Sequence, residues 1–253
     1  MKYTIEAACG CHMGKRRKNN EDNFLFEGKC LEVNNEGLRN VASFTDDLRN
    51  GLSMAVFDGM GGENFGEIAS YTAARKMQEI SRKLSDYFMS ERKFLMQLAM
   101  KLNDAVVEAQ KRLCTERCGT TMVALYFNSG YVYACNVGDS RAYRLRDGEF
   151  LQLSVDHVEK KPPQGGRKPY LTQHIGIDPE EMVIEPYIAK GKINRGDRYL
   201  LCSDGLTDML SNFEISDILT KYDEPNECIH NLIQAALEKG GRDNITAIVC
   251  KLI

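Results

Sequence analysis

The chain has 253 residues, of which 43% are hydrophobic and 27% charged, a length that suits one globular domain over residues 1–253. The formal net charge of −3 gives no electrostatic support for nucleic-acid binding, and no stretch approaches the roughly 20 apolar residues of a membrane span. Because the chain starts without a signal-peptide pattern and has nine scattered cysteines, an odd number, we expect it in the reducing cytoplasm. We also expect a monomer.

Helical periodicity follows a short predicted strand. Residues 53–57 form a β-rich run that ends at Asp58. Beyond it, apolar residues recur three or four positions apart, which predicts two amphipathic helices. The apolar positions are Ala73, Met77, Ile80 and Leu84 in the first helix and Leu95, Leu98, Leu102, Val106, Ala109 and Leu113 in the second.

Strand-like segments dominate the rest of the chain. Turn-forming sequences separate the first four of them, and connections this short predict antiparallel neighbours. We expect strands over 120–127, 131–136, 141–145, 150–153, 182–189, 198–203 and 245–251. Pro225 suits the first turn of one more helix, which Gly240-Gly241 would end. Strands grouped beside pairs of helices favour the α+β class over a doubly wound sheet.

Four aspartates that lie far apart in the sequence, Asp22, Asp58, Asp204 and Asp243, stand in turns or at the ends of apolar runs. At such a position the carboxylate can point out of the core while the sheet fixes the backbone of the residue. One aspartate beside Gly or Asn is more often a turn residue, so only the full set favours a metal site. Oxygen ligands favour Mg²⁺ or Mn²⁺ over Zn²⁺, and nothing around these aspartates supplies a Cys or His pair at zinc spacing. The sequence therefore predicts a carboxylate-held metal site.

Six motifs lie in order along nearly the whole chain, from Gly14 to Asn244. They are Gly14-x-x-Arg17-x-x-Asn20-Glu21-Asp22, Asp58-Gly59-Met60-Gly61-Gly62, Cys118-Gly119-Thr120-Thr121, Asn136-Val137-Gly138-Asp139-Ser140-Arg141, Ser203-Asp204-Gly205-Leu206-Thr207-Asp208 and Gly241-Arg242-Asp243-Asn244. Each motif alone is weak, but six in this order form a specific signature. Together they resemble the metal-dependent, PP2C-type serine/threonine protein phosphatases, and in particular the compact bacterial members of that family.

The resemblance implies a fold of two stacked antiparallel β-sheets flanked by pairs of α-helices. It also implies two tightly bound Mn²⁺ or Mg²⁺ ions, which activate water to hydrolyse phosphoserine or phosphothreonine on proteins that a serine/threonine kinase has modified. By motif position, the metal ligands are Asp22, Asp58, the carbonyl of Gly59, Asp204 and Asp243, with Glu21 as an outer partner. Arg17 matches the phosphate-binding arginine, whose planar fork suits two phosphate oxygens.

A third, weaker ion is also implied by the bacterial members of the family. Asp139, Asp204 and Asp208 match the positions that hold it. The alternative is that Asp139 only forms a turn and that Asp208 only begins a helix. Two other functions stay open: a dedicated phosphatase of one regulatory phosphoprotein, such as an anti-sigma antagonist, or a non-catalytic metal-bound signalling module. The complete carboxylate set argues against the signalling module.

The chain departs from the family pattern at two places. Met60 stands where many eukaryotic members have His, which leaves the acid that protonates the leaving group unassigned. The flap beside the catalytic cleft is shortened, since only residues 158–170 separate Asp156-His157 from Leu171-Thr172. We expect its basic residues to be exposed at the cleft and to attract an anionic phosphoprotein. These residues are Lys160, Lys161, Arg167 and Lys168.

Two groups of cysteines could suggest zinc. They are Cys9-x-Cys11 with His12, and Cys114-x-x-x-Cys118. Each group lacks the second pair of ligands that a structural zinc site needs, so structural thiols are favoured.

Overall fold

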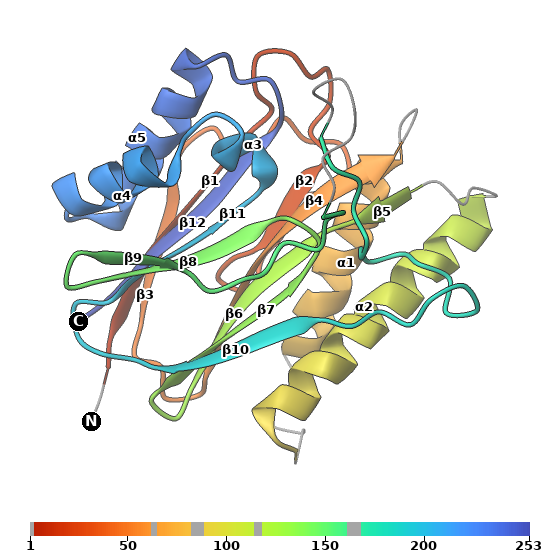
Figure 1. Cartoon of the computed structure of the whole chain (residues 1–253), viewed down its shortest axis with the longest axis horizontal. Helices are drawn as coiled ribbons and strands as arrows, with labels where there is room; N and C mark the ends of the chain where they lie inside the picture. The colour runs from red at the N-terminus through yellow and green to blue at the C-terminus, as the bar shows by residue number, and fades with distance from the viewer. Residues whose placement is uncertain (1–2, 62–64, 82–88, 114–117, 161–167) are drawn as a thin grey trace.

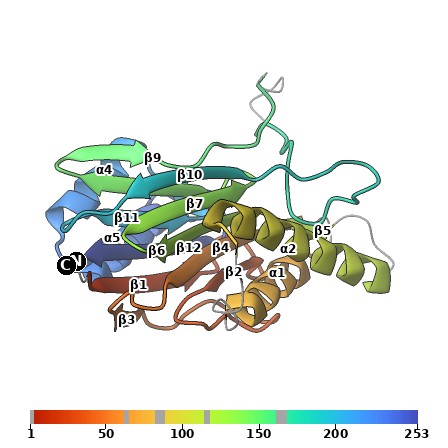
Figure 2. The ribbon, with the colours of Figure 1, turned by 90° about the horizontal axis from the view of Figure 1, so that it is seen from below.

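Two antiparallel β-sheets stack on each other, and helices cover their outer faces (Figures 1 and 2). The computed structural model describes residues 3–61, 65–81, 89–113, 118–160 and 168–253. The sandwich is the α+β fold that the six motifs imply.

Several residues singled out in the sequence lie outside the described ranges, namely Gly62, Leu84, Cys114, Lys161 and Arg167. Within those ranges, no helix combines the length and the apolar character needed to cross a membrane.

The first sheet is built around the last strand of the chain. β12 (Ile245–Leu252) pairs antiparallel with β1 (Ile5–His12) on one side and with β11 (Arg198–Cys202) on the other. The sheet order is β3-β1-β12-β11-β8-β9, and its remaining strands are β3 (Ala42–Asp46), β8 (Arg141–Arg146) and β9 (Glu149–Gln152). Thr4 N–H donates to the carbonyl of Ile253 (3.2 Å), so the two ends of the chain lie side by side.

The second sheet has the order β10-β7-β6-β4-β2, and β5 pairs with the far end of β4. Short turns join β6 to β7, as the sequence predicts for antiparallel neighbours. Its strands are β2 (Asp22–Leu25), β4 (Leu52–Gly61), β5 (Cys118–Thr120), β6 (Met122–Asn128), β7 (Tyr131–Val137) and β10 (Tyr187–Lys192).

Helices pack on the outer face of each sheet, as Figure 1 shows. α1 (Gly66–Ser81) and α2 (Glu91–Leu113) confirm the two helices that the apolar spacing predicts, and α1 packs on β2 and β4. α5 (Pro225–Glu238) begins at the expected proline and packs on β1 and β12 of the first sheet. α3 (Asp204–Thr207) and α4 (Asn212–Lys221) lie beside α5.

Three apolar layers result from this stacking, one between the sheets and one beneath the helices on each side. In the central layer, Phe127 of β6 and Tyr199 of β11 meet edge to face with ring centroids 5.4 Å apart. Both rings are almost completely buried. This contact fixes the two sheets against each other, and it thereby fixes the strand ends that carry the aspartates.

The strand expected over 182–189 is wrong at its start, because β10 begins only at Tyr187. Tyr187 pairs with Asn136, and the partner strand β7 ends at the next residue, Val137. Gly138 then turns the chain away with φ near 105°, so residues before Tyr187 have no ladder to join. The apolar run Met182-Val183-Ile184 thus lies beyond the point where the partner strand stops, and Pro186, which has no N–H to donate, separates it from β10.

Candidate metal centre

Strand pairing brings the first two aspartates together. Asp22 begins β2, Asp58 lies in β4, and the antiparallel register places these residues directly opposite each other. Residues in opposite positions share one face of the sheet, with Cβ atoms about 4.5–5.5 Å apart. The two carboxylates therefore lie close together even though the residues are distant in sequence.

The other two aspartates of the set come from the first sheet. Asp204 is the first residue of α3, just after β11, and Asp243 lies in the turn just before β12. Since β11 and β12 are neighbours, their ends bring Asp204 and Asp243 to the same edge of the sandwich. All but Asp22 line one cavity of about 450 Å³. Its lining residues are Arg17, Glu21, Asp58, Gly59, Met60, Gly61, Thr121, Asp139, Lys168, Pro169, Leu171, Asp204 and Asp243.

Asp22 has a buried oxygen that nothing in the described residues satisfies. Its Oδ2 accepts a hydrogen bond from Ser203 Oγ (2.8 Å), whereas its Oδ1 has no hydrogen-bond partner there. Burial raises the pKa of Asp22 to about 7; hydrogen bonds to its carboxylate lower it, and the negative charges of Asp204 and Asp243 add to the rise. Burial and the charges of Asp204 and Asp22 likewise raise the pKa of Asp58. A buried carboxylate oxygen without a partner costs free energy, and a divalent cation would offset that cost.

Hydrogen bonds to the β5–β6 junction fix the backbone of Asp58. Its N–H donates to Thr121 Oγ1 (3.0 Å), and its carbonyl accepts from the Thr121 N–H (2.8 Å). Thr121 Oγ1 also shares a hydrogen bond of 2.6 Å with Ser140 Oγ. Thr121 thus holds the backbone of Asp58 through both its N–H and its carbonyl, and Asp58 lines the cavity.

Arg17 bridges two acidic residues at the rim of the cavity. Its guanidinium donates to Asp243 Oδ2 (2.7 Å) and to Glu21 Oε2 (3.4 Å). The side chain is 44% exposed, so its outer face stays open to a ligand. Asn244 fixes the backbone beneath it, because its Oδ1 accepts from Glu21 N–H (2.8 Å) and its Nδ2 donates to the Asn19 carbonyl (2.9 Å).

Two glycines are required by close backbone contacts at the site. A Cβ at Gly59 would lie 2.2 Å from the Gly66 carbonyl oxygen and 2.4 Å from that of Glu21. Gly14 has φ near +83°, and a Cβ there would lie 2.2 Å from the Asp243 carbonyl oxygen. Both positions therefore need glycine for the motifs to approach one another.

The residues expected at a third ion are adjacent to one another and to a lysine. Asp139 follows β7 and lines the cavity with Asp204, and burial together with the charge of Asp204 raises the pKa of Asp139 to about 6. Lys168 Nζ lies 2.6 Å from Asp204 Oδ2 and also contacts Asp208 Oδ2. The alternative that Asp208 begins a helix is wrong, because Asp208 closes α3 by donating its N–H to the Asp204 carbonyl (2.8 Å).

The carboxylates line the cavity, but their oxygens do not point at one common position. Among the described residues, no three His, Cys, Asp or Glu side chains are already placed to hold an ion. Arg17 pairs with Asp243 and Lys168 pairs with Asp204, so a cationic side chain already contacts one oxygen of each of these carboxylates. The donor chemistry fits Mn²⁺ or Mg²⁺, since the described lining offers carboxylate and carbonyl oxygens and neither thiolate nor imidazole.

The flap residues within the described ranges differ in their surroundings. Lys160 and Lys168 are both exposed, as expected for this basic stretch. Lys168 is not simply solvated, however, because Asp204 and Asp208 already pair with it. The remaining flap cations, Lys161 and Arg167, lie outside the described ranges.

Two other residues considered in the sequence, Cys11 and His157, make hydrogen bonds that support the fold. Cys11 is buried, and its sulfur accepts hydrogen bonds from Asn20 Nδ2 and Thr246 Oγ1, both at 3.1 Å. His157 Nδ1 accepts the Gly138 N–H (3.2 Å) and so orients the turn that carries Asp139.

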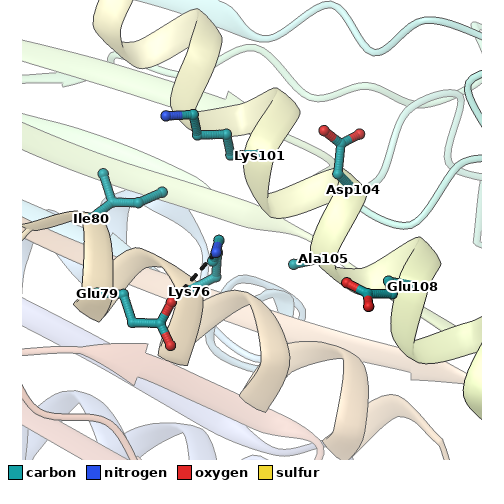
Figure 3. Close-up of a pocket in the computed structure, with 7 residues that line it drawn as sticks. All are labelled: Lys76, Glu79, Ile80, Lys101, Asp104, Ala105 and Glu108. Atoms are coloured by element: carbon teal, nitrogen blue, oxygen red, sulfur yellow. Dashed lines mark hydrogen bonds and ion pairs between the residues drawn. The ribbon is translucent and has the colours of Figure 1, made fainter.

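A separate cavity lies between α1 and α2 and shares no lining residue with the carboxylate cavity (Figure 3). It is lined by Lys76, Glu79, Ile80, Lys101, Asp104, Ala105 and Glu108. The ion pair between Lys76 and Glu79 (3.4 Å) joins adjacent turns of α1. The charged side chains that line this cavity come from the exposed faces of α1 and α2. Charged residues are ordinary on such faces.

Sequence reasoning missed three contacts at the site. Ser203 and Thr121 lie inside recognised motifs, and their small hydroxyl side chains beside metal-ligand candidates are the signal that could have identified them. Lys168 lies outside every motif, and no sequence signal indicates its contact with Asp204.

A model of the family Protein phosphatase 2C matches residues 37–238 of this sequence. The chain belongs to the protein phosphatase 2C family. Members of this family use metal ions. The matched segment includes Asp58 and Asp204, whereas Arg17, Asp22 and Asp243 lie outside it. The fold brings Arg17 and Asp243 to the cavity and places Asp22 opposite Asp58.

Several bacterial phosphatases are similar to the chain. It is 32% identical to the serine/threonine protein phosphatase PstP of Mycobacterium tuberculosis, over 79% of this chain and 40% of that protein. It is 30% identical to the serine/threonine phosphatase stp of Listeria welshimeri, over 77% of this chain and 82% of that protein. The chain therefore spans less than half the length of PstP. The solved catalytic domain of PstP in complex with 2 manganese ions matches with a TM-score of 0.75 and 27% identity, over 99% of both chains.

Proposed function

We propose that this chain is a protein-serine/threonine phosphatase that hydrolyses phosphoserine and phosphothreonine on proteins with a water activated at a pair of Mn²⁺ or Mg²⁺ ions. The observation that carries the proposal is the buried Oδ1 of Asp22, which lacks a partner in the described residues and belongs to a carboxylate directly opposite that of Asp58. The relatives named serine/threonine phosphatases and the neighbour in complex with 2 manganese ions support it.

The residues that would hold the ions are Asp22, Asp58, the carbonyl of Gly59, Asp204 and Asp243. Two divalent ions held there would lower the pKa of a bound water and would stabilise the charge that develops on the phosphoryl group. Ser203 holds Asp22 through its Oδ2 and leaves Oδ1 available, while Thr121 fixes the backbone of Asp58. Anionic carboxylates between two cations offset the repulsion between them.

Arg17 would orient the substrate. Its guanidinium lines the same cavity as Asp58 and is 44% exposed, so two of its N–H groups can face two phosphate oxygens. Its contact with Glu21 gives that residue the role of a positioning partner. Met60 has no proton to donate to the leaving alcohol, so the acid must come from elsewhere in the cavity or from water.

We further propose a third ion site and phosphoprotein partners. Asp139, Asp204 and Asp208 would hold a third, weaker ion. We expect the partners to be phosphoproteins and the protein to act as a monomer in the cytoplasm, where its eight described cysteines, which are free thiols, would remain reduced. The completeness of the carboxylate set argues against a non-catalytic signalling module, because such a module has no need of two activating ions.

The proposal is tested by stripping the protein of metal and restoring Mn²⁺, Mg²⁺, Ca²⁺ or Zn²⁺ separately. The substrates are p-nitrophenyl phosphate and a phosphothreonine peptide. We expect negligible turnover of either substrate without metal and recovery with Mn²⁺ or Mg²⁺. Turnover that persists after verified metal removal, or no turnover with any ion, would overturn the proposal. A panel of phosphopeptides then separates a broad phosphatase from one dedicated to a single phosphoprotein.

A further inference from the structure

Lys168 places its ammonium group between two carboxylates of α3. Its Nζ lies 2.6 Å from Asp204 Oδ2 and also contacts Asp208 Oδ2. The lysine comes from the flap, and it lines the cavity together with Pro169 and Leu171. Although its side chain is 53% exposed, its charged end points inward at the acidic residues.

The helix presents these carboxylates as a pair. Asp204 opens α3, and Asp208 closes it with a hydrogen bond from its N–H to the Asp204 carbonyl (2.8 Å). Residues four positions apart lie on the same side of a helical turn, so one cation can contact both. Lys168 also interacts electrostatically with Asp139, whose pKa it lowers against the larger effect of burial. All three residues assigned to the third ion therefore interact with one lysine.

The ammonium group of Lys168 contacts one oxygen of each of the Asp204 and Asp208 carboxylates. A positive charge so close to the carboxylates neutralises part of the charge that would attract a divalent ion. A divalent ion and Lys168 cannot both occupy the space between Asp204 and Asp208.

We propose that Lys168 is a built-in counter-ion that competes with the third divalent ion for Asp204 and Asp208. The inference rests on the proposed function, because it assumes that the same cavity binds two ions more tightly. The native protein then holds two ions firmly and takes up a third only when the lysine is displaced. Lys168 thus determines how many divalent ions the site binds.

The test is a titration of the metal-stripped full chain with Mn²⁺, in which the paramagnetic resonance signal of free Mn²⁺ reports how many ions are bound. We compare the native protein with Lys168→Met, which keeps the length of the side chain and removes its charge. We expect the third ion to bind about tenfold more tightly to Lys168→Met, while the first two change much less.

Three matched variants separate competition from other effects. Lys160→Met removes another exposed flap charge, so it should bind the third ion as the native protein does. Lys168→Arg keeps the charge and should also preserve weak third-site binding. In Lys168→Met/Asp208→Asn the gain should disappear, because one of the two freed carboxylates is lost. Circular dichroism checks that every variant is folded.

The outcomes distinguish a failure of the proposed competition from a failure of the proposed phosphatase function. Two tight ions in the native protein and an unchanged third affinity in Lys168→Met would overturn the competition while leaving the proposed function intact. An equal gain in Lys160→Met would also overturn it, since the effect would then be a general change of surface charge. A native protein that binds no Mn²⁺ at all would overturn the proposed function, and this inference with it.

Discussion

Ser203 Oγ donates a hydrogen bond to Asp22 Oδ2 (2.8 Å), which links the end of β11 in one sheet to the beginning of β2 in the other. Ser203 Oγ also accepts the N–H of Thr246 in β12 (3.0 Å), so its hydroxyl is fixed at both ends. The bond satisfies one oxygen of Asp22 and leaves the other unpaired among the described residues. The site therefore depends on the register between the two sheets as well as on the aspartates themselves.

Ser203→Ala should weaken metal binding without removing a ligand. The Asp22 carboxylate loses the hydrogen bond that orients it, and loss of such a partner typically lowers metal affinity about 10- to 100-fold. Calorimetric titration with Mn²⁺ checks the affinity. Ser43→Ala, on the exposed side of edge strand β3, is the matched control and should behave like the native protein. Native affinity in Ser203→Ala would mean that Asp22 needs no orienting partner.

Asp58→Asn and Asp204→Asn should each abolish most turnover while the protein stays folded. Each change removes a carboxylate charge but keeps the side-chain volume, so we expect activity to fall by on the order of 100-fold or more. Thermal unfolding in the absence of metal should show no loss of stability, since acidic neighbours repel Asp58 in the native protein. Near-native activity of either variant at limiting Mn²⁺ would show that its aspartate is not a metal ligand.

Arg17→Ala should separate phosphate binding from metal binding. Arginine has no acceptor with which to coordinate a metal, so the variant should keep most of its Mn²⁺ affinity. Turnover of phosphoesters should fall by roughly 100-fold, because the bidentate contact to the phosphate is lost. Arg17→Lys keeps the charge without the planar fork and should recover only part of the rate. A loss of Mn²⁺ affinity that matches the loss of turnover would instead assign Arg17 to holding Asp243.

Asp139→Ala should keep the two tight ions and lower the rate, with part of the loss recovered at high Mn²⁺. Asp208→Ala should behave in the same way if both residues serve one ion. Rates measured across a Mn²⁺ titration, together with the number of bound ions, check this. Unchanged rates in both variants would assign Asp139 to its turn and Asp208 to the end of α3.

Most residues that the motifs single out line one cavity, whereas several strands around it were not predicted. The motif containing Asp22 and the motif containing Asp58 indicate a shared metal site, but only the β2–β4 register shows that the residues are opposite each other. β1 was not predicted, because Ala, Cys and Gly dominate its centre and carry little strand preference even though the strand is central. Its small residues suit α5, whose Ile229 and Ile233 pack against Gly10.

Local signals explain another omission. α4 begins with a capping box in which Ser211 and Glu214 cap each other, and the spacing of Ser211 and Glu214 could have revealed the helix. The pairing of Lys168 with Asp204 has no such signal, because the two residues are far apart in sequence and Lys168 belongs to no motif. Residues fixed by local chemistry are thus readable from sequence, whereas contacts made by crossing loops need the folded structure.

Anomalous X-ray scattering from crystals soaked in Mn²⁺ tests the metal centre most directly. We expect two strong peaks roughly 3.5–4 Å apart, bounded by Asp22, Asp58, Asp204 and Asp243, with the Gly59 carbonyl oxygen at one of them. Data collected on either side of the manganese edge distinguish these peaks from other scatterers. An absence of manganese peaks at saturating Mn²⁺, or peaks only at sites away from Asp22 and Asp58, would contradict the account.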